Sequence, residues 1–174
     1  MTEQDPRSDS NNRRPRRWFR WVRDLALLLA VVVAIQWWQA RDLAHGDAQP
    51  LVGYLVDGQP FQLEPSQGPV LVHFWASWCP VCHLEEGSID AIASNGRVIT
   101  VATNSGTRDE VALHLQQQGL GFPVLMDETG AIARNWGVSG VPASFIVGTD
   151  GRIVHAGMGY STEYGLRLRL WLAD

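Results

Sequence analysis

The sequence contains no lysine and only two cysteines among its 174 residues. Two cysteines cannot cross-link a small fold at several points, so a disulfide framework is excluded and the core must consist of buried apolar side chains. We attribute the missing lysines to genome bias rather than to function. Hydrophobic residues make up 45% and charged residues 18% of the chain, which is typical of a globular protein. Without internal repeats or low-complexity tracts, the length fits one domain with an additional segment.

Basic charge is also scarce outside the N-terminal part of the chain. Residues 1–24 hold seven arginines against four acidic residues, whereas residues 45–174 hold six arginines against thirteen acidic residues. An acidic body of this kind lacks the basic surface that nucleic-acid binding requires. We therefore expect no nucleic-acid partner and look for another role for the basic N-terminus.

An uninterrupted run of eleven apolar residues, 25–35, follows the basic segment. Arginines lie on one side of this run and tryptophans flank both of its ends, which is the pattern of a positive-inside segment with aromatic belts. A spanning helix needs about 20 residues, and we predict a single-pass transmembrane signal anchor over residues 22–39. Residues 1–21 are predicted to be a disordered, basic cytoplasmic tail. A cleaved signal peptide and a buried core helix are the alternatives.

Both an anchor and a cleaved signal peptide would export residues 40–174. In a bacterium, we expect an inner-membrane protein whose catalytic domain faces the periplasm, a compartment that permits disulfides. Residues 40–50 are predicted to be a short linker and residues 51–174 the folded domain.

Strand and helix patterns alternate along the predicted domain. Alternation favours a parallel centre, and two glycine turns add antiparallel strands, so the predicted fold is α/β with a mixed central sheet flanked by helices and an N-terminal β-hairpin extension. Apolar residues at 81, 84, 89 and 92 indicate the buried face of the first helix. The predicted strands are 51–63 (a hairpin around Asp57-Gly58), 68–76, 97–103, 122–127 and 143–159 (a pair around Asp150-Gly151). The predicted helices follow Pro80, Thr107, Thr129 and Ser161 or Thr162. Thr107 can cap the second of these helices in a capping box with Glu110, and Gly119 is predicted to end it.

Both cysteines lie within one turn of the segment FWASWCPVCHLEE, residues 74–86. Such a pair can bind zinc, carry c-type haem, or cycle between dithiol and disulfide. A closed zinc site needs four ligands and no second cysteine pair exists. The letters CPVCH match the haem attachment motif, but here the motif follows a buried strand and begins a helix. A copper- or haem-handling module that uses Cys79, Cys82 and His83 is the alternative to the redox interpretation.

The redox interpretation explains the residues around the cysteines. Cys79 lies where the strand meets the helix, and Pro80 takes the first helical position, where a missing N–H costs nothing. The free amides and the helix dipole favour a thiolate, which lowers the pKa of Cys79 below the free value of about 8.5. Cys79 is thus predicted to be the attacking thiol and Cys82, one turn inside, the resolving thiol. This chemistry needs neither a cofactor nor a metal.

Two segments resemble the thioredoxin-fold proteins. VLVHFWASWCPVCHLEE is similar to their active-site segment, above all in the membrane-anchored periplasmic TlpA/ResA-like and ScsD-like branch, and GVSGVPASFIV (137–147) resembles their cis-proline loop. The resemblance covers residues 50–174. It implies a thiol:disulfide oxidoreductase with protein thiol or disulfide substrates and a transmembrane electron donor or acceptor, in cytochrome c maturation or in copper-stress tolerance. The direction of electron flow stays open.

The resemblance also implies roles for individual residues. Pro142 would face the cysteines in cis, leaving the backbone of Val141 free to pair with a substrate peptide. Glu85, three residues after Cys82, would be within reach of the Cys82 proton.

Several neighbours of the motif have simpler expected roles. His73 takes the position of a buried aspartate in thioredoxin and is interpreted as a core residue. Trp75 is expected in the core, whereas His83 and Glu86 are expected to face solvent. Trp78, together with Pro80 and Val81, is predicted to form the apolar surface that binds substrate.

Overall fold

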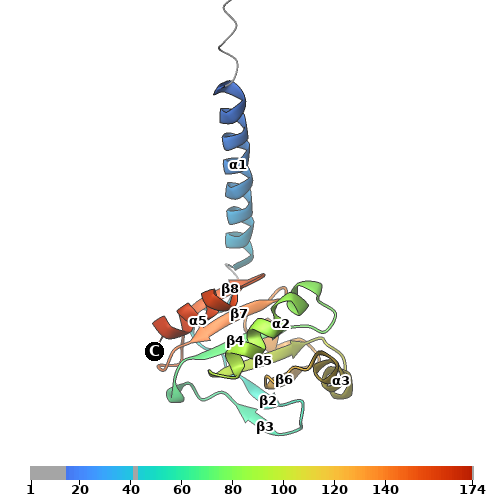
Figure 1. Cartoon of the computed structure of the whole chain (residues 1–174). Helices are drawn as coiled ribbons and strands as arrows, with labels where there is room; N and C mark the ends of the chain where they lie inside the picture. Colours follow the sequence, from blue (N-terminus) through green and yellow to red (C-terminus); the bar gives the residue numbers. More distant parts are fainter. Residues whose placement is uncertain (1–14, 41–42, 174) are drawn as a thin grey trace, which may run out of the picture. The chain divides into compact units, whose positions relative to one another are not determined.

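The computed structural model describes residues 15–40 and 43–173, in two compact units that divide the chain at Trp38 (Figure 1). The described residues of the first unit, 15–38, all belong to helix α1 (Pro15–Ala40). The predicted helix over 22–39 lies within α1, which also takes in residues 15–21 of the predicted disordered tail; residues 1–14 lie outside the described residues. Within the described part of the chain, no helix combines the length and the apolar character needed to cross a membrane.

A six-stranded mixed sheet forms the centre of the second unit. Its strands are β1 (Gly46–Asp47), β4 (Val70–Trp75), β5 (Val98–Thr103), β6 (Val124–Asp127), β7 (Ala143–Val147) and β8 (Arg152–Met158). They lie in the order β1-β8-β7-β4-β5-β6. β4, β5 and β6 are parallel, while β7, β8 and β1 are added antiparallel at the other side of β4. The predicted mixed sheet with a parallel centre is confirmed.

Four helices and a hairpin cover this sheet (Figure 1). The helices are α2 (Pro80–Ala93), α3 (Arg108–Gln118), α4 (Ala131–Asn135) and α5 (Glu163–Leu172), the hairpin pairs β2 (Val52–Tyr54) with β3 (Pro60–Gln62), and a 3-10 turn, η1, covers Pro65–Gln67. The hairpin turn lies at Asp57-Gly58, as predicted, because glycine adopts the positive φ of +88° that this turn requires. A single bridge between Leu55 and Leu125 joins the hairpin to the edge of the sheet.

Both faces of the sheet are buried, each under its own apolar layer. Side chains of β4 alternate between the two layers: Leu71 and Trp75 pack with Ile89 of α2 and Leu166 of α5, while Phe74 packs on the other face with Trp136 and its neighbours. Phe74, Phe145 and Trp136 form a cluster of tilted and edge-to-face rings. Burial on both faces explains why β4 has apolar residues on both of its faces, with His73 as its polar residue, rather than an alternating pattern.

The chain joins the domain earlier than the sequence predicts. Residues 40–50 are predicted to be a linker, yet Leu43 is only 2% exposed in the core and β1 pairs with β8. The backbone N–H of Ala44 also donates to the Trp136 carbonyl at 2.9 Å. The linker prediction is therefore wrong from residue 43 onward. A strand of only two residues without an apolar pattern cannot be recognised from the local sequence.

The buried face of α2 also differs from the prediction. Ile89 and Ile92 are buried as expected, but Val81 and Leu84 are exposed, and Cys82, Glu85 and Glu86 are buried instead. Residues 82, 85, 86 and 89 are three or four positions apart and so share one helical face. The apolar pattern indicated the wrong face because two of the residues that pack against the sheet are glutamates.

Candidate active site

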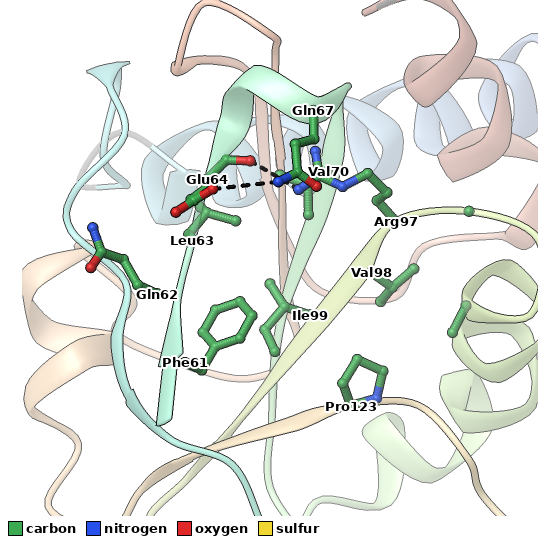
Figure 2. Close-up of a pocket in the computed structure, with 12 residues that line it drawn as sticks. Phe61, Gln62, Leu63, Glu64, Gln67, Val70, Arg97, Val98, Ile99 and Pro123 are labelled. Atoms are coloured by element: carbon green, nitrogen blue, oxygen red, sulfur yellow. Dashed lines mark hydrogen bonds between the residues drawn. The ribbon is translucent and has the colours of Figure 1, made fainter. Parts of the chain in front are cut away.

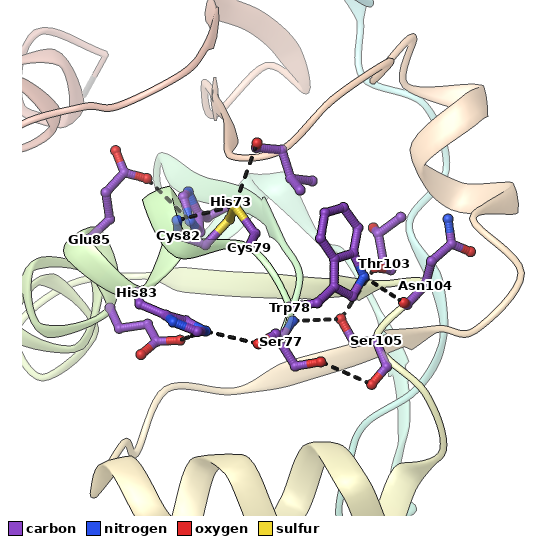
Figure 3. Close-up of a disulfide and its surroundings, with 12 residues drawn as sticks. His73, Ser77, Trp78, Cys79, Cys82, His83, Glu85, Thr103, Asn104 and Ser105 are labelled. Atoms are coloured by element: carbon purple, nitrogen blue, oxygen red, sulfur yellow. Dashed lines mark hydrogen bonds and ion pairs between the residues drawn. A yellow bond between two sulfur atoms is a disulfide. The ribbon is translucent and has the colours of Figure 1, made fainter.

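The two cysteines lie at the N-terminus of α2, directly after the loop that leaves β4 (Figure 3). Cys79 is the N-cap residue, and its sulfur accepts the backbone N–H of Cys82 at 3.2 Å. The two sulfurs form a disulfide, with the Cα atoms 5.3 Å apart. Pro80 occupies the first helical turn, as predicted. The cysteine pair is thus brought together at the positive end of a helix dipole, where a sulfur anion is stabilised.

Hydrogen bonds from the segment after β5 hold the loop before Cys79. Ser105 Oγ accepts the Ser77 backbone N–H at 3.1 Å, and the Ser77 hydroxyl donates to the Ser105 carbonyl at 3.2 Å. The Trp78 indole N–H donates to the Asn104 carbonyl at 2.9 Å. Sequence reasoning missed Asn104 and Ser105. The sequence did indicate their position, because they follow the predicted strand 97–103. The carboxyl ends of neighbouring parallel strands meet at one edge of a sheet.

The loop before β7 approaches the disulfide from the neighbouring strand. The Val141–Pro142 peptide bond is cis, and the Val141 carbonyl oxygen lies 3.7 Å from the Cys79 sulfur. The structure therefore places Val141 and Pro142 beside the disulfide, where the resemblance implies them.

A shallow pocket of about 140 Å³ opens beside this loop. Trp78 and Val141 both line it, and Trp78 remains 64% exposed although its indole N–H is bound. Pro80 and Val81 are exposed on the first turn of α2. The four residues predicted to bind substrate thus form an accessible surface around Cys79.

Glu85 is fully buried one turn after Cys82. Its Oε1 atom accepts the backbone N–H of Ser161, while Oε2 has no hydrogen-bond partner among the described residues. Burial raises the pKa of Glu85 to about 7, although the Ser161 hydrogen bond acts in the opposite direction. The carboxyl group can therefore gain or lose a proton near neutral pH.

His73 is the polar residue that faces the free oxygen of Glu85. Its Nε2 atom lies 3.8 Å from Glu85 Oε2, and its Nδ1 atom lies 2.9 Å from the Ser144 hydroxyl oxygen. Burial lowers the pKa of His73 to about 4, so the ring is neutral at pH 7. The prediction of a buried core histidine is confirmed, but its position opposite Glu85 was missed. The alternation of β4 contained that signal, because His73 shares the α2-facing side with Trp75.

Predictions for three further neighbours of the cysteines have different outcomes. His83 is exposed, as expected, and Trp75 is buried, with its indole N–H donating to Thr100 Oγ1 at 3.1 Å. Glu86, expected to face solvent, is only 7% exposed and lies 2.7 Å from His114 Nε2. The expectation failed because α3 packs over this side of α2, which local sequence does not reveal.

A larger cavity of about 380 Å³ lies at the opposite end of β4, near Val70, where the strand begins (Figure 2). The guanidinium group of Arg97, which lines the cavity, already has hydrogen-bond partners. It donates to the carbonyl oxygens of Gly68 at 2.6 Å and Glu64 at 2.9 Å. The cavity is remote from the disulfide, and we assign it no part in the site.

The sheet order, the cysteine pair at a helix N-terminus and the cis-proline loop beside it define a protein of the thioredoxin-like class, which confirms the resemblance. The chain belongs to the AhpC/TSA family, which matches residues 47–156.

Known proteins similar to this chain support that assignment. Thiol:disulfide interchange protein DsbE of Escherichia coli (strain K12) is 29% identical over 153 residues, covering 76% of this chain and 82% of the relative. Thiol:disulfide interchange protein CycY of Rhizobium leguminosarum bv. viciae is 37% identical over 100 residues, 56% of this chain and 53% of the relative. The crystal structure of a thioredoxin-family thiol:disulfide interchange protein from Chlorobium tepidum TLS aligns with a TM-score of 0.64 and 25% identity, covering 75% of this chain and 97% of that one.

Proposed function

We propose that this protein is a thiol:disulfide oxidoreductase that exchanges electrons with protein substrates through Cys79 and Cys82. The observation that carries this proposal is the disulfide at the N-terminus of α2, with the Val141 carbonyl 3.7 Å from the Cys79 sulfur. The names of the relatives, which are thiol:disulfide interchange proteins, support the same chemistry.

The reaction is a pair of thiol–disulfide exchanges. In the reduced protein, the Cys79 thiolate attacks a substrate disulfide, forms a mixed disulfide and releases one substrate thiolate. Cys82 then loses its proton and attacks the Cys79 sulfur, which releases the second substrate thiol and restores the Cys79–Cys82 disulfide. Two electrons pass to the substrate, and the reverse sequence oxidises a substrate dithiol.

Two features of α2 support this assignment of roles. The Cys82 backbone N–H at 3.2 Å and the helix dipole stabilise negative charge on Cys79, which makes it the attacking and the leaving sulfur. Cys79 is 4% and Cys82 1% exposed, so both sulfurs are buried. Cys79 lies between the exposed residues Trp78 and Pro80, so a protein substrate reaches it first.

Glu85 is the proposed acceptor of the Cys82 proton. It lies one turn along the same buried face of α2, and its pKa of about 7 lets it take up and release a proton at neutral pH. The neutral His73 ring adds no positive charge that would hold Glu85 ionised.

The surface around Cys79 is the proposed substrate-binding site. Trp78, Pro80 and Val81 are exposed beside the disulfide, and Val141 offers backbone atoms next to a proline that cannot donate a hydrogen bond. An extended substrate peptide can pair with such a backbone edge.

For the pathway, the TlpA/ResA-like resemblance favours a reductase in cytochrome c maturation that a transmembrane electron donor recharges, and the ScsD-like resemblance favours copper-stress tolerance. The reduction potential separates the directions. A value near −270 mV, about that of thioredoxin, indicates a reductase, and a value near about −120 mV indicates an oxidant.

We also propose that residues 1–39 direct export, so that the domain works where disulfides persist. The arginines before the apolar run 25–35 support this proposal. A reporter that is active only outside the cytoplasm, fused after Asp174, should be active with the full chain and inactive when residues 1–39 are deleted. Activity of both fusions, or of neither, would contradict export by this segment.

Trapping of mixed disulfides tests the catalytic proposal. In Cys82→Ser the second exchange is blocked, so acid quenching and alkylation of cells should capture substrates bound through Cys79. The matched variant Cys79→Ser keeps one thiol but should trap far less, because Cys82 lies inside α2 and lacks the N-cap position that stabilises a thiolate. Equal trapping by both variants, or none by either, would contradict the proposal. Copper or haem retained stoichiometrically through purification, without insulin reduction, would instead favour the binding-module alternative.

A further inference from the structure

Three side chains next to the disulfide site, but not part of it, gather between α2 and α3. They are His83, Glu86 and His114, which we call the His–Glu–His cluster. One ring nitrogen of each histidine and one carboxylate oxygen of Glu86 all lie within 4.8 Å of one another. Glu86 Oε1 lies 2.7 Å from His114 Nε2 and 4.0 Å from His83 Nε2. A single carboxylate oxygen therefore lies within 4.0 Å of a ring nitrogen of each histidine.

The surrounding fold holds this arrangement in place. His83 and Glu86 are three residues apart and share one side of α2, while His114 reaches them from α3. The two imidazole rings stack with centroids 5.3 Å apart, and the ring of Trp75 packs against His114 at 5.4 Å. Glu86 is buried and His83 is exposed, so the cluster is held inside the fold on one side and is accessible to solvent on the other.

The chemistry of these groups is that of a transition-metal site. Two histidines and one glutamate, with a further position open to water, form a ligand set that zinc uses in proteins. Calcium and magnesium prefer sites made of oxygen ligands, so the imidazoles select against them. We propose that the His–Glu–His cluster binds a divalent transition-metal ion of the zinc class, independently of Cys79 and Cys82.

The distances require only small movements. Ligand atoms about 2.0–2.1 Å from a tetrahedral ion lie roughly 3.3 Å apart, between the 2.7 Å and 4.0 Å separations of Glu86 from the two histidines. The two histidine nitrogens lie within 4.8 Å of each other, so they must approach by at most about 1.5 Å. The ion replaces a proton between Glu86 and His114. His83 Nε2 now lies 2.8 Å from the Ser77 carbonyl oxygen, and ligation through this atom exchanges that contact for the metal bond.

Zinc titration of the full-length oxidised protein tests the site. With the disulfide intact, the cysteine sulfurs are bound to each other, so binding that remains is separate from the proposed catalytic chemistry. Calorimetry with zinc chloride at pH 7.5 should give one ion per chain. His83→Ala and His114→Ala should each weaken binding at least about tenfold, since each removes a ligand. His45→Ala, which removes an exposed histidine outside the cluster, should leave the affinity unchanged.

A cobalt titration provides a second measurement. Cobalt(II) bound at a three-ligand site should show visible absorption bands that are lost in His83→Ala. His83 is exposed and packs in no core, so this variant decides the question even if His114→Ala, which loses a contact with Trp75, fails to fold. The proposal is overturned if the wild type binds no zinc, or if His83→Ala binds zinc as well as His45→Ala does. Either result leaves the thiol:disulfide proposal untouched, because that proposal depends on substrate trapping.

Discussion

Two adjacent acidic residues on α2 are both buried, yet their surroundings give them different chemistry. Glu86 is paired with His114, whereas one oxygen of Glu85 faces a neutral imidazole and has no hydrogen-bond partner among the described residues. An unpaired carboxylate in an apolar setting is costly to ionise, so its protonated form is favoured. The difference makes Glu85 a group for proton transfer and Glu86 a candidate ligand.

Glu85→Gln should change how stability depends on pH. The pKa of Glu85 is about 7 in the folded protein and 4.5 as its ordinary value. The stability that this higher folded pKa contributes is full below pH 4.5 and is lost as pH rises through 7. Glutamine does not ionise, so the variant should exceed the wild type in free energy of unfolding at pH 8 by about 3 kcal/mol, since one pKa unit corresponds to about 1.4 kcal/mol. Urea unfolding at several pH values measures the difference.

His73 changes the stability with pH in the opposite direction to Glu85. The effect of Glu85 is therefore measured as the difference between the wild type and Glu85→Gln. Burial lowers the folded pKa of His73 to about 4, and its contribution therefore rises with pH between about 4 and 6.5. Both proteins retain this term, and it cancels in the difference. Glu128→Gln removes an exposed carboxylate and is the control. An advantage of Glu85→Gln that stays constant from pH 4.5 to 8 would contradict the raised pKa.

The same substitution should slow catalysis although it stabilises the fold. If Glu85 accepts the Cys82 proton, insulin reduction by the wild type should rise with pH through about 7, and Glu85→Gln should lose that rise. General-base contributions are typically about 10²- to 10⁴-fold, so a drop of at least about tenfold at pH 7.5 is expected. The assay contains EDTA, which keeps the proposed metal site out of the comparison. A variant with the wild-type rate and pH profile would remove Glu85 from the mechanism.

At the scale of elements, local capping signals were reliable. Thr107 caps α3 and forms a capping box with Glu110, and Gly119 ends the helix in a left-handed conformation, all as the sequence predicts. Thr107→Ala should lower the free energy of unfolding by about 1 kcal/mol, because it leaves the Glu110 backbone N–H without its acceptor. Thr107→Ser keeps the hydroxyl and is the matched control. Equal unfolding midpoints for the alanine and serine variants would show that the cap contributes nothing.

The elements that sequence predicted and those that it missed differ in the range of their interactions. The capping box, the Asp57-Gly58 turn and the cysteine turn are each determined by a few neighbouring residues, and all three were predicted. The face of α2 depends instead on what the helix meets in space. Glu85 is buried because the Ser161 backbone lies against it, 76 residues further along the chain. No local pattern contains that contact, so the burial of Glu85 emerged only from the structure. The side of β4 on which His73 lies could be inferred from the strand alternation.

At the scale of the whole molecule, the folded domain begins within the predicted linker. Leu43 is buried in the apolar layer that contains Trp136 and Phe145, and β1 extends the sheet beyond β8. The sequence predicts the domain from residue 51, because the hairpin that starts there has the first recognisable strand pattern. Residues 43–48 are therefore a structural part of the domain despite their unremarkable sequence.

Two truncations should separate these boundaries. Both apolar layers are formed by residues from Leu43 onward, so deletion of residues 1–38 should leave the urea midpoint of the domain unchanged. Deletion of residues 1–50 also removes Leu43 and β1. Truncation of one buried leucine typically costs about 2–5 kcal/mol, and this deletion should destabilise the domain by at least that much. Leu43→Ala in the longer fragment is the matched control and should account for most of that loss. If both fragments unfold at the same urea concentration, the domain begins at residue 51 and the packing of Leu43 contributes no stability.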